Sequence, residues 1–342
     1  MSHKTTIADI ARELNTSAAT VSRALSNHPR ISNETKKSVH FTAIKLNYKR
    51  NKVASSLRLG KTHLIGVIIP SAEINFFGSV VHGIESIANL NGYSVLLYQS
   101  NESGEYEENG IETFLSARVD GILVSLAKGT VDYSHFEQIK KRKVPVVLFD
   151  RSNDGLGIDS VEIDDYKGAY MATQHLISKG YKKIAHIAGP VHLKNFAERI
   201  RGYKAALLDN HLPIDDSYIY HGNVSIESGR EGVRHFLLIP EPPDAIFATE
   251  DFTALGVMKE LKERGIKIPQ EFGIIGFANE QFGEHITPTL SSVDQQTIQM
   301  GKSALSLLID LIEKRGGEED HRQKVVLEPL LICRESSDRK EF

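Results

Sequence analysis

The chain has 342 residues, 40% of them hydrophobic and 25% charged, a composition typical of a globular protein with two or three domains. A single cysteine, Cys333, excludes an internal disulfide and a cysteine-rich metal site, and the fourteen histidines show no metal-ligand spacing. No apolar signal segment stands at the N-terminus, and no apolar run approaches the roughly 18 to 20 residues of a membrane span. We therefore expect a cytoplasmic protein without a metal or cofactor.

Positive charge is concentrated at the N-terminus. Residues 1–60 carry eleven Lys or Arg and three Asp or Glu, a balance of +8 (11 − 3). Because the whole chain has a net charge of −3, the rest carries −11 (−3 − 8). A basic segment on an acidic body suggests a polyanion as the partner of that segment, although charge alone fits a solvated basic surface equally well.

Three short helices are predicted in this basic segment. The first follows Thr6 as a cap, ends before Asn15, and has its apolar stripe at Ile7, Ile10, Ala11 and Leu14. The second follows the Ser17 cap, with Val21, Ala24 and Leu25 facing inward and Ala18, Ala19, Ser22 and Arg23 facing outward. The third follows the Ser32 cap, with Val39, Ala43 and Leu46 facing inward. This is the helix-turn-helix plan, and together with the charge it predicts DNA binding.

The next stretch, residues 47–62, is mostly basic and polar, with apolar side chains that include Val53, Ala54 and Leu57. A helix of about eight residues is too short to persist alone in water, because nucleation is costly. We expect this segment to be a flexible linker that folds only against a partner.

From Leu64 onward, apolar strands alternate with amphipathic helices. The unit begins with HLIGVIIP (63–70), SVVHGIESIANLNG (79–92) and YSVLLYQS (93–100), and it recurs around residues 121–150, 183–210 and 245–279. Such alternation predicts parallel sheets with helices on both faces, and a segment of this length usually divides into two lobes. Ligands of such folds bind where the strands end at their carboxyl side.

The basic N-terminal segment (the head), the linker that follows it (the hinge) and the strand–helix body together resemble the LacI/GalR family of bacterial transcription regulators. The resemblance runs from about Thr5 to Arg334. The matching stretches are TTIADIARELNTSAATVSRALS (5–26), ASSLRLGKT (54–62), VDGILV (119–124), VEIDDYKGAYMATQHLISKGYKKIAHIAGP (161–190) and TEDFTALGVMKELKERGIKIPQEFGIIGF (249–277). The resemblance implies an α/β protein: a small all-α helix-turn-helix head with a hinge helix, and a two-lobed, periplasmic-binding-protein-like effector domain of parallel sheets. It implies domains at 1–48 (head), 49–61 (hinge helix and linker), 62–163 plus 292–325 (N-terminal lobe) and 164–291 plus 326–342 (C-terminal lobe), with crossings near Ile163, Ser291 and Val325.

Carried over position by position, the resemblance puts base contacts on Ala18, Ala19 and Arg23. Further DNA contacts fall on Thr6, Ser17, Thr20, Ser22, His28, Asn51, Ala54 and Leu57. Arg23 can pair with a guanine edge and an alanine methyl can pack on a thymine methyl, although Arg23 could instead form a salt bridge with a neighbouring acid. The resemblance also implies paired hinge helices in the minor groove, with Leu57 opening the central base step. The chain departs from the family at Arg50, where many members have proline.

The resemblance further puts the effector between the lobes, on Phe76, Phe77, Arg151, Asn195, Arg199, Glu250, Ala278 and Gln295. Aromatic faces suit a sugar ring, and the polar groups can bind hydroxyls or an anion. Phe76 and Phe77 could also be partly core, and Arg151 could be a lobe–lobe ion pair. Ala278 stands where many sugar-responsive members have aspartate, which hints at an acidic or phosphorylated ligand. Glu250 restores a negative charge, and a protein co-regulator could replace a small effector.

We therefore expect a homodimeric, effector-controlled repressor of carbohydrate-utilisation genes that binds palindromic operator DNA. The effector would be a sugar, a sugar acid or a sugar phosphate. A small-molecule enzyme on the same fold is the second hypothesis, although residues 155–157 (GLG) lack the context of a dinucleotide loop and no P-loop is present. A sugar-binding module is the third, and the basic head argues against it. The C-terminal tail has no heptad pattern that would favour a tetramer.

Overall fold

A computed structural model of the chain describes residues 5–48, 61–314 and 322–339. They belong to two separate units, a head within residues 1–62 and a body within residues 63–342, and each is considered by itself. The expected hinge contacts Asn51, Ala54 and Leu57, and the departure at Arg50, lie outside the described residues.

The head consists of three short helices, α1 (Ile7–Glu13), α2 (Ala18–Leu25) and α3 (Asn33–Lys45). Local capping sets where two of them begin, because the Ser17 hydroxyl accepts the Thr20 N–H and the Ser32 hydroxyl accepts the Thr35 N–H, both at 3.1 Å. The three helices share a core whose central side chains, Ile10, Val21 and Val39, are fully buried. The predicted helix-turn-helix head is thus confirmed.

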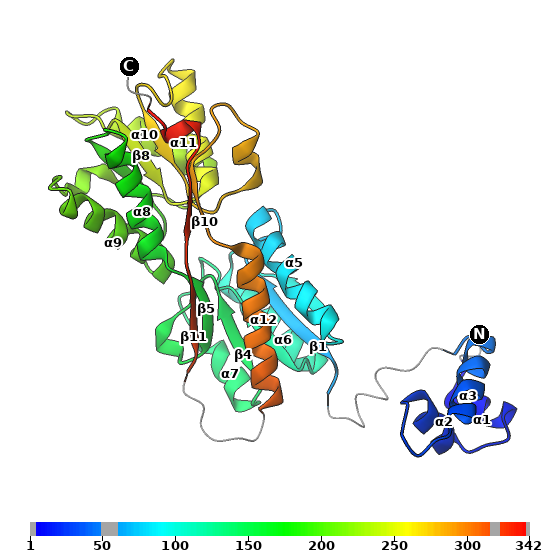
Figure 1. Cartoon of the computed structure of the whole chain (residues 1–342). Helices are drawn as coiled ribbons and strands as arrows, with labels where there is room; N and C mark the ends of the chain where they lie inside the picture. Colours follow the sequence, from blue (N-terminus) through cyan, green and yellow to red (C-terminus); the bar gives the residue numbers. More distant parts are fainter. Residues whose placement is uncertain (1–4, 49–60, 315–321, 340–342) are drawn as a thin grey trace. The chain divides into compact units, whose positions relative to one another are not determined.

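The first lobe of the body, called here the N-lobe, is built on a six-stranded parallel sheet with the strand order β11-β5-β4-β3-β1-β2. Its strands are β1 (Leu64–Ile69), β2 (Ser94–Gln99), β3 (Gly121–Val124), β4 (Val146–Phe149), β5 (Asp159–Ile163) and β11 (Lys324–Leu327). Alternate strand residues face opposite ways, so one set packs on α5 (Asn75–Leu90) and α12 (Thr297–Glu313). The other set packs on α6 (Gly104–Ala117) and α7 (His135–Lys141), and Figure 1 shows where these helices lie.

Helices α5 and α12 pack closely because glycines face the partner helix where they meet. A methyl group on Gly83 would lie 2.2 Å from the carbonyl oxygen of Ile298, and one on Gly301 would lie 2.0 Å from that of Val80. No side chain fits either position without moving the two helices apart. This packing fixes the start of α5, which carries Phe76 and Phe77.

The second lobe, called here the C-lobe, repeats the plan with a four-stranded parallel sheet in the order β7-β6-β8-β9. Its strands are β6 (Ile184–Ala188), β7 (Ile219–His221), β8 (Ala245–Ala248) and β9 (Gly273–Ile275). Helices α8 (Asp165–Ser178) and α9 (Lys194–Asp209) cover one face, and α10 (Ile226–Phe236) and α11 (Asp251–Glu263) cover the other. The predicted two-lobed α/β architecture is confirmed.

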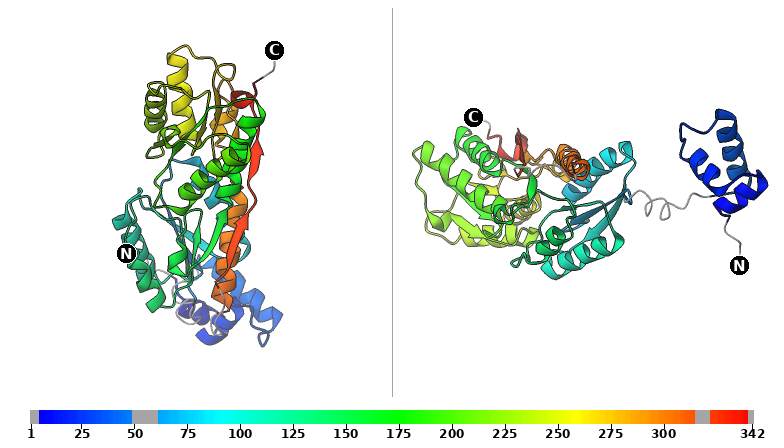
Figure 2. Two further views of the ribbon diagram at one scale, coloured as in Figure 1. Left: turned by 90° about the vertical axis from the view of Figure 1, so that its left-hand side faces the viewer. Right: turned by 90° about the horizontal axis from the view of Figure 1, so that it is seen from below.

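The chain passes between the two sheets three times, and Figures 1 and 2 show these passages side by side. The first follows β5, the second runs through β10 (Ser292–Asp294), and the third joins β11 to β12 (Leu330–Ile332). Strands β10 and β12 pair antiparallel to each other. Short 3₁₀ helices occur at Asp154–Leu156, Asp216–Tyr218, Gln281–Glu284 and Glu335–Ser337. We propose these passages as the boundaries between the lobes, so that each lobe is discontinuous in sequence.

Candidate functional site

The expected DNA-reading residues lie on the outer face of α2. Ala18, Ala19 and Arg23 are exposed, whereas Val21 and Ala24 belong to the head core. The salt bridges described within the head join Arg12 to Asp9 and Lys45 to Glu13, and none of them involves Arg23. The guanidinium of Arg23 is therefore exposed and available to a base edge.

Several of the other polar residues expected to contact DNA are held by local hydrogen bonds. The Asp9 carboxylate accepts both the N–H and the hydroxyl of Thr6, at 2.9 and 2.7 Å. The hydroxyls of Ser17 and Thr20 lie 2.9 Å apart. The Nδ1 atom of His28 accepts the Arg30 N–H at 3.2 Å. These bonds orient the side chains before any DNA is present.

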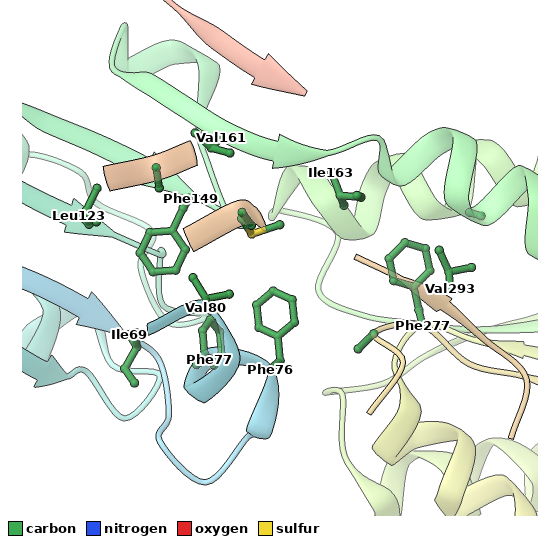
Figure 3. Close-up of a cluster of buried hydrophobic side chains, with 14 of the residues drawn as sticks. Ile69, Phe76, Phe77, Val80, Leu123, Phe149, Val161, Ile163, Phe277 and Val293 are labelled. Carbon is green, nitrogen blue, oxygen red and sulfur yellow. The ribbon is translucent and has the colours of Figure 1, made fainter. Parts of the chain in front are cut away.

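The body contains a cavity of about 320 Å³ between its two lobes. All eight residues expected to contact the effector lie on its wall: Phe76, Phe77, Arg151, Asn195, Arg199, Glu250, Ala278 and Gln295. They meet because the loops that follow the strands of both parallel sheets converge on the cleft. Figure 3 shows Phe76 and Phe77 at the start of α5 and Phe277 beside Val293 on the C-lobe side.

Phe76 and Phe77 serve both the core and the cavity wall. They are 6% and 2% exposed, and their rings meet edge to face at 5.0 Å. In Figure 3, Phe77 lies close to Val80 and Phe149 of the N-lobe core. The aromatic wall is therefore rigid before a ligand arrives.

Arg199 is buried and fully engaged by protein groups. It binds the Asp165 carboxylate at 2.8 Å, the carbonyl oxygen of Thr249 at 2.6 Å and the amide oxygen of Gln295 at 3.3 Å. Its guanidinium carbon lies 3.7 Å from the centre of the Phe277 ring, a cation–π contact. Arg199 thus supports the C-lobe as well as lining the cavity.

Arg151 is also paired with a carboxylate, Glu102, in the same lobe. Two N–H groups of Arg151 donate to the two oxygens of Glu102 at 2.8 and 3.2 Å, a bidentate pair. A third bond reaches the Leu126 carbonyl oxygen at 3.2 Å. Burial opposes the charge of Glu102, but Arg151 holds its pKa below the usual value. Arg151 therefore forms its ion pair within the N-lobe rather than between the lobes.

Several carboxyl groups around the cavity are buried, and their hydrogen bonds and ion pairs do not fully offset the cost of ionising them there. Burial and the neighbouring Asp251 raise the pKa of Glu250 to about 8. Burial raises the pKa of Asp165 to about 7 in spite of Arg199, and it raises that of Asp150 as well. Among the described residues, the buried atoms Glu250 Oε1 and Asn195 Oδ1 have no hydrogen-bond partner. Both residues line the cavity, where these two polar atoms can bond a ligand or water.

The cavity wall also includes residues in strained backbone conformations. Ala278 has φ +124° and Val224 has φ +62°, both in the region that favours glycine. The N–H of Ala278 is held by the Val293 carbonyl oxygen at 2.9 Å, next to the second passage. Such strain is characteristic of ligand sites, where the surrounding structure over-determines the backbone.

Sequence reasoning missed ten residues of the cavity wall. They are Glu73, Ile74, Glu102, Lys128, Asp150, Phe196, Val224, Ser225, Ile226 and Phe252. Glu102 and Lys128 follow β2 and β3 in chain order, so their place at the carboxyl ends of parallel strands was a usable signal. The described residues contain no cluster of His, Cys, Asp or Glu suited to a metal ion.

Polar contacts fasten the two lobes across the cleft. The Phe76 N–H donates to Glu280 Oε1 at 3.0 Å. Lys128 Nζ donates to the Asn223 carbonyl oxygen at 3.0 Å, and His192 Nε2 lies 2.8 Å from the carbonyl oxygen of Lys128. These contacts join the two lobes beside the cavity.

Comparison with known proteins gives two family matches. Residues 6–51 match the model described as bacterial regulatory proteins, lacI family, and residues 173–337 match the periplasmic binding protein-like domain. Catabolite control protein A of Priestia megaterium is 38% identical over 310 residues, 90% of this chain and 93% of that relative. The chain belongs to the lacI family of bacterial regulatory proteins. This regulator is a DNA-binding transcription repressor with an effector-binding domain, like its relatives.

Further similarities cover between 80% and 97% of the lacI-family regulator. The transcriptional repressor PurR of Actinobacillus pleuropneumoniae is 31% identical over 97% of this chain and 98% of its own length. Among solved structures, transcription regulator CcpA of Lactococcus lactis has a TM-score of 0.73 at 32% identity, covering 80% of this chain and 98% of its own. The CelR–cellobiose complex has a TM-score of 0.73 at 26% identity, covering 97% and 99%. No helix within the described ranges is long and apolar enough to cross a bilayer.

Proposed function

We propose that this regulator represses carbohydrate-utilisation genes as a homodimer on a palindromic operator, under the control of a neutral sugar bound between its lobes. The cavity residues would bind this sugar without chemical turnover. The proposal extends the family assignment to the effector, the partner and the genes.

The observation that carries the effector class is the pair of unsatisfied atoms, Glu250 Oε1 and Asn195 Oδ1. With a pKa of about 8, Glu250 is largely protonated at pH 7 and can both donate and accept through its carboxyl group. The Asn195 oxygen accepts a hydrogen bond. Adjacent hydroxyls of a sugar ring both donate and accept, so they complement these two groups, and Phe76 and Phe252 offer apolar surface to the ring.

The bonding of the cavity's arginines favours a neutral sugar over a sugar acid or a sugar phosphate. Arg151 and Arg199 each already donate hydrogen bonds to a carboxyl group and to a carbonyl oxygen, so their guanidinium groups are engaged before a ligand arrives. Lys128 lies 3.8 Å from Glu102 and so shares this one carboxylate with Arg151. Because the arginine donors are already occupied, the proposal takes a neutral sugar over the acidic ligand at which Ala278 hints.

The head supports the DNA side of the proposal. Ala18 and Ala19 present only methyl groups, so Arg23 would supply most of the direct base discrimination. A single head offers a small contact surface. In a dimer, two heads related by two-fold symmetry would contact the two half-sites of a palindrome and so double that surface. Among similar structures, the CelR regulator was solved with cellobiose, which agrees with a sugar as effector class.

The test begins with selection of operator DNA from a random duplex library on the full-length protein. Gel-shift titration of the selected duplex would then be repeated with glucose, cellobiose and ribose, and with gluconate and glucose 6-phosphate as anionic counterparts. We expect a neutral sugar to change operator affinity and the anions to have no effect. A response to the anions alone would contradict the effector class, and failure to select any duplex would contradict operator recognition.

A further inference from the structure

Helix α5 begins without a capping side chain of its own. The residue before it, Ile74, has an apolar side chain, and the first N–H groups of a helix have no partner within the helix. The N–H of Phe77 reaches the carbonyl oxygen of Ile74 at 3.1 Å. The N–H of Phe76 instead donates to the carboxylate of Glu280, 3.0 Å away and 204 residues later in the sequence.

Glu280 reaches α5 from the other lobe. It follows β9 of the C-lobe, directly before the 3₁₀ helix Gln281–Glu284, and is 3% exposed. Its own backbone N–H donates to Asp251 Oδ2 at 2.6 Å, and Asp251 Oδ1 accepts the Ser292 hydroxyl at 2.7 Å. The backbone of Glu280 is therefore fixed without its side chain, which leaves the carboxylate for α5.

This contact is electrostatically favourable to the helix. The N-terminus of a helix carries partial positive charge, so a carboxylate placed there stabilises it. Burial raises the pKa of Glu280, and the hydrogen bond from Phe76 opposes that rise. The contact between Lys128 and Asn223 also crosses the cleft, but it lies at the surface, where water competes for both groups. The contact between Glu280 and Phe76 is buried, so water does not compete for it.

We propose that Glu280 is a positioning residue that caps α5 across the cleft. In this role it holds the two lobes together and sets Phe76 and Phe77 on the cavity wall. A movement that separates the lobes breaks this cap and exposes the start of α5 to water. The residue thus links the closure of the C-lobe to the conformation of the aromatic wall. This role goes beyond the proposed function because it does not depend on the identity of the effector.

Amide hydrogen exchange in the full-length protein tests the cap directly, without any effector. Exchange at the Phe76 N–H would be followed by mass spectrometry with residue-level fragmentation in the wild type and in Glu280→Ala and Glu280→Gln. Glu284→Ala is the matched control, because Glu284 lies in the adjacent 3₁₀ helix and its exposed side chain pairs with Arg334. Melting curves of all four proteins establish that each variant folds.

We expect Glu280→Ala to accelerate exchange at Phe76 by about ten- to a hundredfold, the loss typical of a charged hydrogen bond. Glu280→Gln keeps an acceptor without the charge, so its exchange should lie between those of the wild type and Glu280→Ala. Glu284→Ala should leave Phe76 unchanged. Unchanged exchange in Glu280→Ala, or an equal change in Glu284→Ala, would overturn the proposal. If Glu280→Ala does not fold, exchange at Phe76 as slow in Glu280→Gln as in the wild type would overturn it as well.

Discussion

Arg199 and Asp165 form a salt bridge of 2.8 Å in which the two side chains are only 3% and 7% exposed. Arg199 also lies over the Phe277 ring and binds the Thr249 carbonyl oxygen. One side chain thus joins α9 to the start of α8 and to the end of β8, directly beneath the cavity. Substituting it therefore tests stability as well as ligand binding.

Arg199→Met should lower the free energy of unfolding by about 3–5 kcal/mol, because it leaves the Asp165 carboxyl buried without its partner. Removing both charges in Arg199→Met with Asp165→Asn should recover at least about 1 kcal/mol of that loss. Urea unfolding of the wild type, the single variant and the double variant measures both values. Equal stability of the single and double variants would show that the ion pair is not the source of the loss.

Glu250 should make stability depend on pH. Its pKa rises from 4.5 to about 8 on folding, so its stabilising contribution is present below pH 4.5 and is lost as the pH rises through 8. Glu250→Gln removes the ionisation. The variant should match the wild type at pH 5 and exceed its unfolding free energy at pH 9 by about 1–3 kcal/mol. Unfolding curves at both pH values test this, with the exposed Glu73→Gln as a control that should show no such divergence.

Arg23 should discriminate between operator sequences. We expect Arg23→Ala to cost about 1–3 kcal/mol on the selected operator and to relax the preference at one base pair in each half-site. The control is Arg12→Ala, since Arg12 is exposed on α1 and pairs with Asp9. Affinities of wild type and both variants, measured on the operator and on random duplex at one salt concentration, show whether Arg23 contacts a base. Equal losses on both duplexes would identify Arg23 as a phosphate contact.

Lys128 should retain the sugar by joining the two lobes beside the cavity. Lys128→Met keeps the apolar stem but loses the bond to the Asn223 carbonyl oxygen. We expect sugar affinity to fall about three- to tenfold, the range of one ordinary hydrogen bond, with operator affinity in the absence of sugar unchanged. Lys141→Met, an exposed lysine of α7, serves as the control. Calorimetric titration with the sugar found in the gel-shift panel measures the change, and unaltered affinity in Lys128→Met would rule out this role.

The sequence by itself determined the features that depend on near neighbours. Ser17 and Ser32 cap α2 and α3 as the local pattern predicts, because a cap joins residues only three positions apart. The alternation of strands and helices predicts the parallel sheets in the same way, since each element shows its own period. The eight effector contacts that the family resemblance implies also line one cavity.

Only the tertiary structure decided which partners these residues have. Arg151 and Arg199 look available for an anion in the sequence, yet the folded chain pairs them with Glu102 and Asp165. Glu280 caps a helix that begins 204 residues earlier. A charged side chain can pair with many others, and no local pattern says which one the folded chain brings within 3 Å of it. Burial then fixes the protonation state of groups such as Glu250, because the cost of charge depends on the water that the whole fold excludes.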